Sequence, residues 1–230
     1  MSEGFHNSSE LTMQRIKNRK GYRDLSTVCI VPTRGMIPAR VVESWMALMA
    51  PMNQKFHRMF VEGMEVGAAY THAIEQILAH PDLQNWKYVL TLEEDNMPPP
   101  DGLLKLYESI DDYGAVGGLY WTKGQEGQPM IYGNPEGILN FHPQLPKPDT
   151  IQECNGLGMG FTLFRLEIFK DEKIPRPWFK TEQSWEPNVG ARAYTQDLYA
   201  FENIRAAGYK VACDTRVKVG HYSVEDGFVW

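Results

Sequence analysis

The chain has 230 residues, of which 43% are hydrophobic and 23% are charged. These proportions are those of an ordinary globular protein, and they exclude a disordered chain or a fibrous repeat. Lys plus Arg number 23 against 29 for Asp plus Glu, and the resulting net charge of −6 disfavours a protein that coats nucleic acid. This length predicts one domain over residues 25–230, preceded by a loosely attached polar lead-in over residues 1–24.

Charge clusters and cysteines bear on partners and location. Basic residues gather at 15–23, and we interpret this segment as a solvated tail in preference to a patch for an anionic partner. Cys29, Cys154 and Cys213 lie far apart, which argues against a disulfide scaffold and favours a reducing compartment. Residues 1–14 lack the apolar core of a signal peptide, and no run approaches about 18 apolar residues. We therefore expect a cytoplasmic protein without a transmembrane segment.

Apolar runs that are typical of buried strands alternate with segments of helical periodicity through the first half of the chain. In chain order the predicted elements are a strand at 26–32, a helix between Pro38 and Pro51, a strand at 56–62, a helix at 65–79, a strand at 87–92, a helix at 101–110 and a strand at 114–121. This alternation is typical of an α/β protein with a largely parallel sheet. Ligands of such sheets bind beyond the carboxyl ends of the strands, so the loops after Val31, Val61 and Leu92 are the expected site.

The second half of the chain has a different pattern. Gly and Pro are frequent over 122–150, which predicts hairpins or a mobile flap in place of another strand–helix unit. An apolar run follows at 162–169, and residues 170–193 are expected to form an irregular loop. A helix over 195–207, ended by a glycine, and a strand, turn and strand over 209–223 complete the predicted elements.

Three consecutive carboxylates, Glu93, Glu94 and Asp95, follow the buried strand that ends at Leu92. They repel one another and lose hydration there, and a cation would relieve both costs. Asp and Glu oxygens together with a diphosphate are the usual coordination of Mg²⁺ and Mn²⁺. Side chains alternate along an extended segment, which predicts that Glu93 and Asp95 face one way and Glu94 the other. The alternative is a solvated acidic turn ahead of the prolines at 98–100.

Five segments resemble, in their order along the chain, those of the GT-A fold glycosyltransferases, particularly the family 2-like and phage-encoded ones. YVLTLEEDNMPPPDGLLKL is similar to their strand ending in a DxD motif, with Glu93 in place of the first Asp, and VCIVPTRG is similar to their first strand and its nucleotide-contacting turn. AVGGLYW and ECNGLGMGFTLFRLEIF resemble the segments that shape the donor-sugar pocket. TQDLYAFENIRAAGYKVACDTRVKVGHY resembles the helix, strand and terminal histidine of the family. Together the segments span residues 26–222.

This resemblance implies a GT-A fold, which is a Rossmann-like three-layer α/β/α sandwich, and a metal-dependent sugar transfer. The donor would be a nucleotide-diphosphate sugar, first of all a UDP-sugar, and the family's metal, Mn²⁺ or Mg²⁺, would be held by Glu93, Asp95 and His221. Asp197 would be the base that deprotonates an acceptor hydroxyl in an inverting single displacement. From the residues alone, Asp197 could instead be a first-turn acid that stabilises its helix, and His221 a structural histidine.

The resemblance also implies contacts with the donor nucleotide. Pro32 and Thr33 would lie near the base or ribose, Glu62 would meet the ribose hydroxyls or base edge, and Glu94 is assigned to the same donor site. Arg34 is assigned there as well, with a surface ion pair as the alternative.

The donor sugar and the acceptor would meet other segments. Gly156 and Gly158 would let the backbone approach a sugar, since glycine has no side chain to obstruct it, although glycines at a bulge are the alternative. Trp185 and Glu186 are the expected acceptor-side pair, because indole faces stack on sugar rings.

Two other classes compete with a glycosyltransferase. A sugar-phosphate nucleotidyltransferase would carry a Gly-rich, basic phosphate loop after the first strand, whereas TRGMIPAR has one Gly and two Arg. A non-catalytic carbohydrate-binding module would keep the cleft without turnover, and the presence of Asp95, Asp197 and His221 together argues against it. The acceptor is left open between a glycan, a protein, a lipid and a modified nucleic acid.

Overall fold

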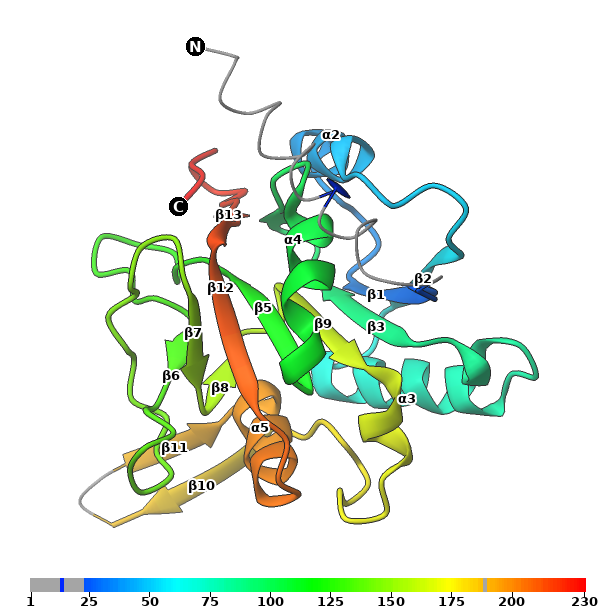
Figure 1. Cartoon of the computed structure of the whole chain (residues 1–230). Helices are drawn as coiled ribbons and strands as arrows, with labels where there is room; N and C mark the ends of the chain where they lie inside the picture. Colours follow the sequence, from blue (N-terminus) through cyan, green and yellow to red (C-terminus); the bar gives the residue numbers. More distant parts are fainter. Residues whose placement is uncertain (1–12, 15–22, 188–189) are drawn as a thin grey trace.

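A seven-stranded sheet runs through the centre of the computed structural model, which describes residues 13–14, 23–187 and 190–230 (Figure 1). In spatial order its strands are β2 (Phe56–Glu62), β1 (Thr27–Thr33), β3 (Tyr88–Leu92), β9 (Phe161–Arg165), β5 (Ala115–Leu119), β12 (Val211–Lys218) and β7 (Ile151–Cys154). The strands β2, β1, β3, β5 and β12 run in one direction, and β9 and β7 run against them. The prediction of a mostly parallel sheet is confirmed.

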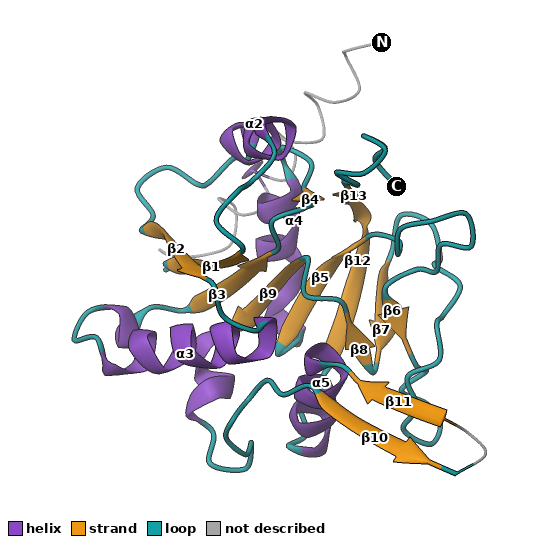
Figure 2. Cartoon of the chain, turned by 180° about the vertical axis from the view of Figure 1, so that it is seen from behind, coloured by secondary structure: helices purple, strands orange, loops and turns teal. Residues whose placement is uncertain are grey.

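Helices cover both faces of this sheet and complete a Rossmann-like three-layer fold (Figure 2). On one face lie α3 (Val66–Ala79) and α5 (Gln196–Ala206), and on the other lie α2 (Ala39–Ala47) and α4 (Gly102–Ser109). Short 3₁₀ helices occur at η1 (Leu83–Asn85), η2 (Ile110–Asp112) and η3 (Leu166–Lys170). None of the helices in the described residues is long and apolar enough to cross a membrane.

The side chains of β1 alternate between two hydrophobic cores, one on each face of the sheet. Val28 and Ile30 pack in the cluster that includes α3 and α5, whereas Cys29 and Val31 pack in the cluster that includes α2 and α4. Because both faces of this strand are buried, its sequence is a continuous apolar run and not an alternating one. That continuity made the strand predictable from the sequence.

Three short strand pairs lie outside the main sheet. They are β4 (Asn96–Met97) with β13 (Gly220–His221), β6 (Ile131–Tyr132) with β8 (Gly156–Leu157), and β10 (Glu182–Glu186) with β11 (Gly190–Tyr194). The prediction of an irregular loop over 170–193 is therefore wrong at its C-terminal end, where β10 and β11 form an antiparallel hairpin. The expected second strand after the turn near 219 is only the two-residue β13.

Most of the expected lead-in over 1–24, including the basic cluster up to Lys20, lies outside the described residues. Within it, Arg23 is described, and its guanidinium lies 2.5 Å from the Asp111 carboxylate and donates to the Tyr88 hydroxyl at 3.0 Å. The last basic residue of the cluster is thus attached to the sheet and to the end of η2.

Candidate functional site

The loops after β1 and β3 meet at one edge of the sheet, as the carboxyl ends of parallel strands do. They line a cavity of about 300 Å³. Its lining residues come from the end of β1 and the residue after it, from the segment that leads into α3 and from the carboxylate run after β3: Pro32, Thr33, Arg34, Met64, Val66, Glu93, Glu94 and Asp95. The structure therefore brings six of the sequence-predicted residues around one space.

The three carboxylates do not follow an extended path. Asn96 donates its backbone N–H to the carbonyl of Glu93 at 3.0 Å, which closes a turn over residues 93–96. The prediction that Glu93 and Asp95 face one way and Glu94 the other assumed an extended path, and it stays a prediction, since the chain turns here. Each carboxylate has its own set of partners.

Glu94 connects the two loops. Its Oε2 accepts the Thr33 hydroxyl at 2.8 Å and the Arg34 backbone N–H at 2.9 Å, and its Oε1 lies 2.5 Å from the Arg34 Nε. Burial alone raises the pKa of Glu94, but these three donors outweigh it and hold the pKa below its ordinary value. The ion pair that was the alternative for Arg34 exists, and it fixes the shape of the loop after β1.

Asp95 faces two basic groups. Its Oδ2 lies 2.5 Å from the Lys123 ammonium and 3.4 Å from His221 Nε2. Burial raises the pKa of Asp95, yet His221 and Lys123 offset this and lower the pKa to about 2. Asp95 is therefore a carboxylate at any physiological pH.

His221 reaches Asp95 because β13 pairs with β4 (Figure 2). In that antiparallel pair His221 lies opposite Asn96, and Tyr222 donates its backbone N–H to the Asp95 carbonyl at 2.7 Å. The ring is fixed by its Nδ1, 2.8 Å from the Trp121 carbonyl, and by an edge-on contact with Tyr120. The imidazole is thus held in one orientation, with Nε2 toward the Asp95 carboxylate.

Glu93 lies apart from that pair. Its Oε1 is 3.5 Å from the Tyr70 hydroxyl, and burial, followed by the charges of Asp95 and Asp197, raises its pKa to about 8. The described residues contain no group of three His, Cys, Asp or Glu side chains that could hold a metal. The expected three-ligand set is therefore not assembled as such: Asp95 and His221 come together, and Glu93 does not join them.

Asp197 occupies the first turn of α5, and its charge acts on Glu93. It is 6% exposed, and its Oδ1 accepts the Leu198 backbone N–H at 2.9 Å and the Thr195 hydroxyl. Burial raises the pKa of Asp197, and the hydrogen bonds to Thr195 and Leu198 oppose this rise.

The charges of Glu93 and Asp197 both act on the buried hydroxyls of Tyr70 and Tyr120, whose pKa values rise first through burial and then through these charges. The two carboxylates thus share one low-dielectric environment, although no direct hydrogen bond joins them in the described residues. Titratable groups with shifted pKa values that gather in one place are typical of functional sites.

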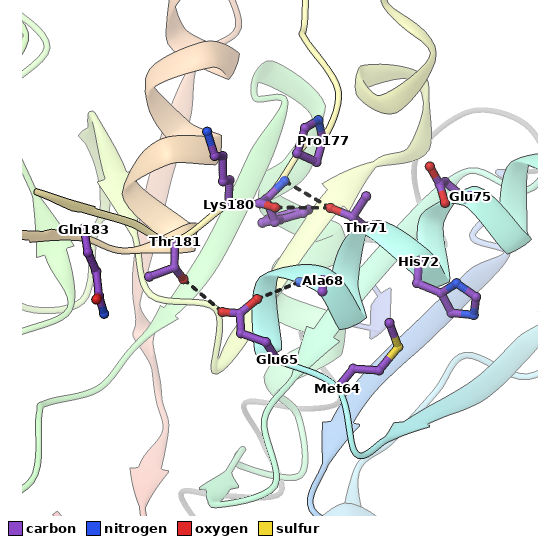
Figure 3. Close-up of a pocket in the computed structure, with 11 residues that line it drawn as sticks. Met64, Glu65, Ala68, Thr71, His72, Glu75, Pro177, Lys180, Thr181 and Gln183 are labelled. Atoms are coloured by element: carbon purple, nitrogen blue, oxygen red, sulfur yellow. Dashed lines mark hydrogen bonds between the residues drawn. The ribbon is translucent and has the colours of Figure 1, made fainter.

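A second, larger groove of about 710 Å³ adjoins the first through Met64, which lines both (Figure 3). One wall is the outer face of α3 and the other is the segment 177–183. Glu65 joins the walls, because its Oε1 accepts the Thr181 hydroxyl at 2.9 Å and its Oε2 accepts the Ala68 backbone N–H at 2.9 Å. The Thr181 hydroxyl also lies 3.4 Å from the Gln196 side chain, next to Asp197.

The other sequence-predicted residues lie around this centre. Glu62 is opposite Thr33 at the end of β2 and lies beside Gly35. Trp185 is 71% exposed on β10, and the side chain of Glu186 lies outside what the structure describes.

Gly156 and Gly158 are buried against the chain's own side chains. A Cβ at Gly156 would lie 3.0 Å from the Phe141 ring, and one at Gly158 would overlap the Tyr120 hydroxyl. Close packing between protein segments accounts for both glycines.

Sequence reasoning missed two residues of the site. Lys123 is a single lysine in a Gly- and Pro-rich stretch, and the available signal was its place just beyond the carboxyl end of β5. Tyr70 belongs to the apolar face of α3, where a tyrosine has the pattern of a core residue. Only its hydroxyl, directed at Glu93, distinguishes it.

The fold and the edge position of the site define an α/β protein of the Rossmann-like class. No family model matches the sequence, and no curated protein matches it. Among solved structures, the one titled "Crystal Structure of A197 from STIV" is similar, with a TM-score of 0.61 at 18% sequence identity. The match covers 89% of this chain and 92% of that chain. At this identity the likeness shows a common fold alone.

Proposed function

We propose that the chain is a GT-A type glycosyltransferase that moves a sugar from a nucleotide-diphosphate sugar to an acceptor hydroxyl. The observation that carries the proposal is the pairing of Asp95 and His221, 3.4 Å apart at the carboxyl edge of the sheet and beside the cavity formed by Thr33 and Glu94. Ligands of doubly wound sheets bind at this edge. The fold shared with A197 is compatible with the proposal.

The Asp95–His221 pair fits a divalent ion. With Nδ1 against the Trp121 carbonyl, a neutral His221 would offer Nε2, and Asp95 would offer a carboxylate oxygen, to an ion placed between them. Mn²⁺ and Mg²⁺ accept oxygen ligands, and Mn²⁺ also suits imidazole. The chemistry that such an ion would supply is neutralisation of the charge on the departing diphosphate.

The chain's own residues would then position the reactants. The loop of Thr33 and Arg34, held by Glu94, faces the nucleotide, with Glu62 at its side. Asp197 accepts the proton of the acceptor hydroxyl as the acceptor oxygen bonds to the anomeric carbon. The bond from that carbon to the diphosphate breaks, and its electrons leave with the diphosphate, which gives inversion. Trp185 would contact the acceptor, with its indole stacked on a sugar ring.

A glycan, a protein, a lipid or a modified nucleic acid would each present the acceptor hydroxyl that this transfer needs. The proposed compartment is the cytoplasm, because Cys29, Cys154 and Cys213 are free and buried, which suits a reducing environment.

The Asp95→Asn variant tests the function. The chain is incubated with a panel of nucleotide sugars, Mn²⁺ and candidate acceptors, and the released nucleotide is identified by mass. We expect Asp95→Asn to lower turnover about a hundredfold or more, since Lewis-acid stabilisation is worth several kcal/mol. Asp82→Asn is the matched control, because Asp82 pairs with Lys55 on the surface at 3.0 Å, away from the cavity.

The product separates this function from its rival. Release of a nucleoside diphosphate supports transfer, and release of pyrophosphate would identify a nucleotidyltransferase instead. Wild-type turnover in Asp95→Asn, or in a fully chelated sample, would contradict the proposed role of the ion. An unchanged circular dichroism spectrum and thermal midpoint show that the variant is folded.

A further inference from the structure

Lys123 lies beside Asp95 and has no role so far in the proposed transfer. Its ammonium lies 2.5 Å from Asp95 Oδ2, the same oxygen that faces His221 Nε2 at 3.4 Å. An ion that binds Asp95 Oδ2 together with His221 would therefore displace this ammonium. The chain itself thus supplies a cation, the Lys123 ammonium, at the Asp95 carboxylate.

The turn that carries Lys123 is well fixed. The Thr122 backbone N–H donates to the Gln128 carbonyl at 2.9 Å, and the Gln128 N–H donates to the Thr122 hydroxyl at 2.9 Å. Gly124 has a φ of +105°, which suits a tight reversal directly after Lys123. The backbone thus presents the lysine at the rim of the cavity, next to Trp121, whose carbonyl fixes His221.

The lysine side chain is free to change partners. It is 35% exposed, compared with 19% for the Asp95 side chain, and Asp95 is its hydrogen-bond partner among the described residues. Rotation about its flexible stem moves the ammonium without moving the turn. Asp95 lines the cavity assigned to the donor, so phosphates bound there would lie within reach of that ammonium.

We propose that Lys123 is a phosphate-binding residue: it occupies Asp95 Oδ2 in the ligand-free chain and transfers to the phosphate oxygens of a nucleoside diphosphate when one binds. This inference rests on the proposed glycosyltransferase function. In this proposal the Lys123 ammonium offsets part of the negative charge of the leaving diphosphate, in addition to any ion at Asp95 and His221. A lysine acts as a point charge on phosphate.

The proposal predicts two changes of opposite sign in Lys123→Met. Binding of Mn²⁺ alone, followed by the electron paramagnetic resonance signal of the free ion, should tighten about tenfold, because the competing ammonium is gone. Binding of a nucleoside diphosphate at saturating Mn²⁺, measured by titration calorimetry, should weaken about tenfold or more, the size of one charge-assisted hydrogen bond. The probe is whichever of UDP, GDP, CDP and ADP binds the wild-type chain most tightly.

Two further variants complete the test. Lys123→Arg keeps the charge and should retain most of the diphosphate affinity. Lys210→Met is the matched control, because Lys210 forms an ion pair of the same kind with Glu153 at 3.1 Å and is 58% exposed, outside the residues lining the cavity. It should change neither affinity.

Each outcome decides a different claim. If wild type binds a nucleoside diphosphate and Lys123→Met binds it equally well, the inference is wrong and the proposed function stands. An unchanged Mn²⁺ affinity in Lys123→Met would also overturn it, since the ammonium would then not compete for Oδ2. If wild type binds none of the four diphosphates with Mn²⁺ present, the proposed function and the inference fail together.

Discussion

Glu93 shows how a carboxylate of the acidic run can act differently from its neighbours. It is half-buried beside the Tyr70 hydroxyl and close to the charges of Asp95 and Asp197. Burial, then these two charges, raise its pKa from 4.5 to about 8. Glu93 is therefore protonated at neutral pH in the metal-free chain, while Asp95, two residues on, is ionised.

This difference predicts a pH-dependent stability for the metal-free chain. Between pH 4.5 and about pH 8 the unfolded chain loses the Glu93 proton while the folded chain keeps it, so stability falls as pH rises through this window. Glu93→Gln removes the effect and should gain roughly 2 kcal/mol relative to wild type across the window, after allowance for partial exposure. Urea unfolding in the presence of a chelator measures it, and parallel curves for the two proteins would contradict the assignment.

At the scale of elements, the start of α3 is tied to the segment that leads into β10. Glu65 is the N-cap of α3, and its carboxylate also accepts the Thr181 hydroxyl. Burial raises the pKa of Glu65, but the N–H groups of Ala68 and Gly67 and the Thr181 hydroxyl outweigh it and lower the pKa. One side chain thus caps a helix and holds the two walls of the larger groove together.

Removal of this cap should cost stability. Glu65→Ala is expected to lower the free energy of unfolding by about 1 kcal/mol at neutral pH, the usual cost of a lost N-cap. Because the folded-state pKa is lowered, the ionic part of this contribution is present above pH 4.5 and is lost as pH falls through the folded-state pKa. Glu65→Gln, which keeps an acceptor oxygen, should lose less, and equal losses in the two variants at neutral pH would contradict a capping role.

At the scale of the whole molecule, the predictable parts are those with local signals. The first-half strands and helices were predictable because each carries an apolar run or a helical face that packs on the same sheet, as β1 and α3 do. The hairpin of β10 and β11 was not, since its strands pair only with each other in the described residues and carry no apolar run. Strand β9 had an apolar signal, but its insertion between β3 and β5 depends on contacts distant in sequence.

The residues of the candidate site also divide into those with a local sequence signal and those without one. The carboxylate run after β3 and the histidine near the chain's end were identifiable, because each stands at the end of an apolar strand. Their separate partners were not: the turn at 93–96 sends Glu93 to Tyr70, and Lys123 meets Asp95 across 28 positions. Side-chain partners across such separations are fixed by the packing of the sheet, which no local pattern of residues encodes.

The C-terminal segment joins the two halves of the site. After β13 the chain turns back, with His221 and Trp230 exchanging backbone hydrogen bonds at 2.9 and 3.0 Å and the Ser223 N–H donating to the Phe228 carbonyl at 2.8 Å. These bonds lie outside the main sheet, and they support the residue that faces Asp95. The global fold therefore depends little on this segment, whereas the geometry of His221 depends on it.

Truncation after Ser223 should consequently separate binding from folding. The truncated chain is expected to keep the far-ultraviolet circular dichroism spectrum of the sheet and helices, and to bind Mn²⁺ about tenfold more weakly because His221 loses its backbone support. His221→Ala should show a similar loss, and combining the two changes should add little, since both act through one imidazole. Additive losses would mean that the tail contributes to binding by another route, and an unchanged affinity would mean that β4 alone positions His221.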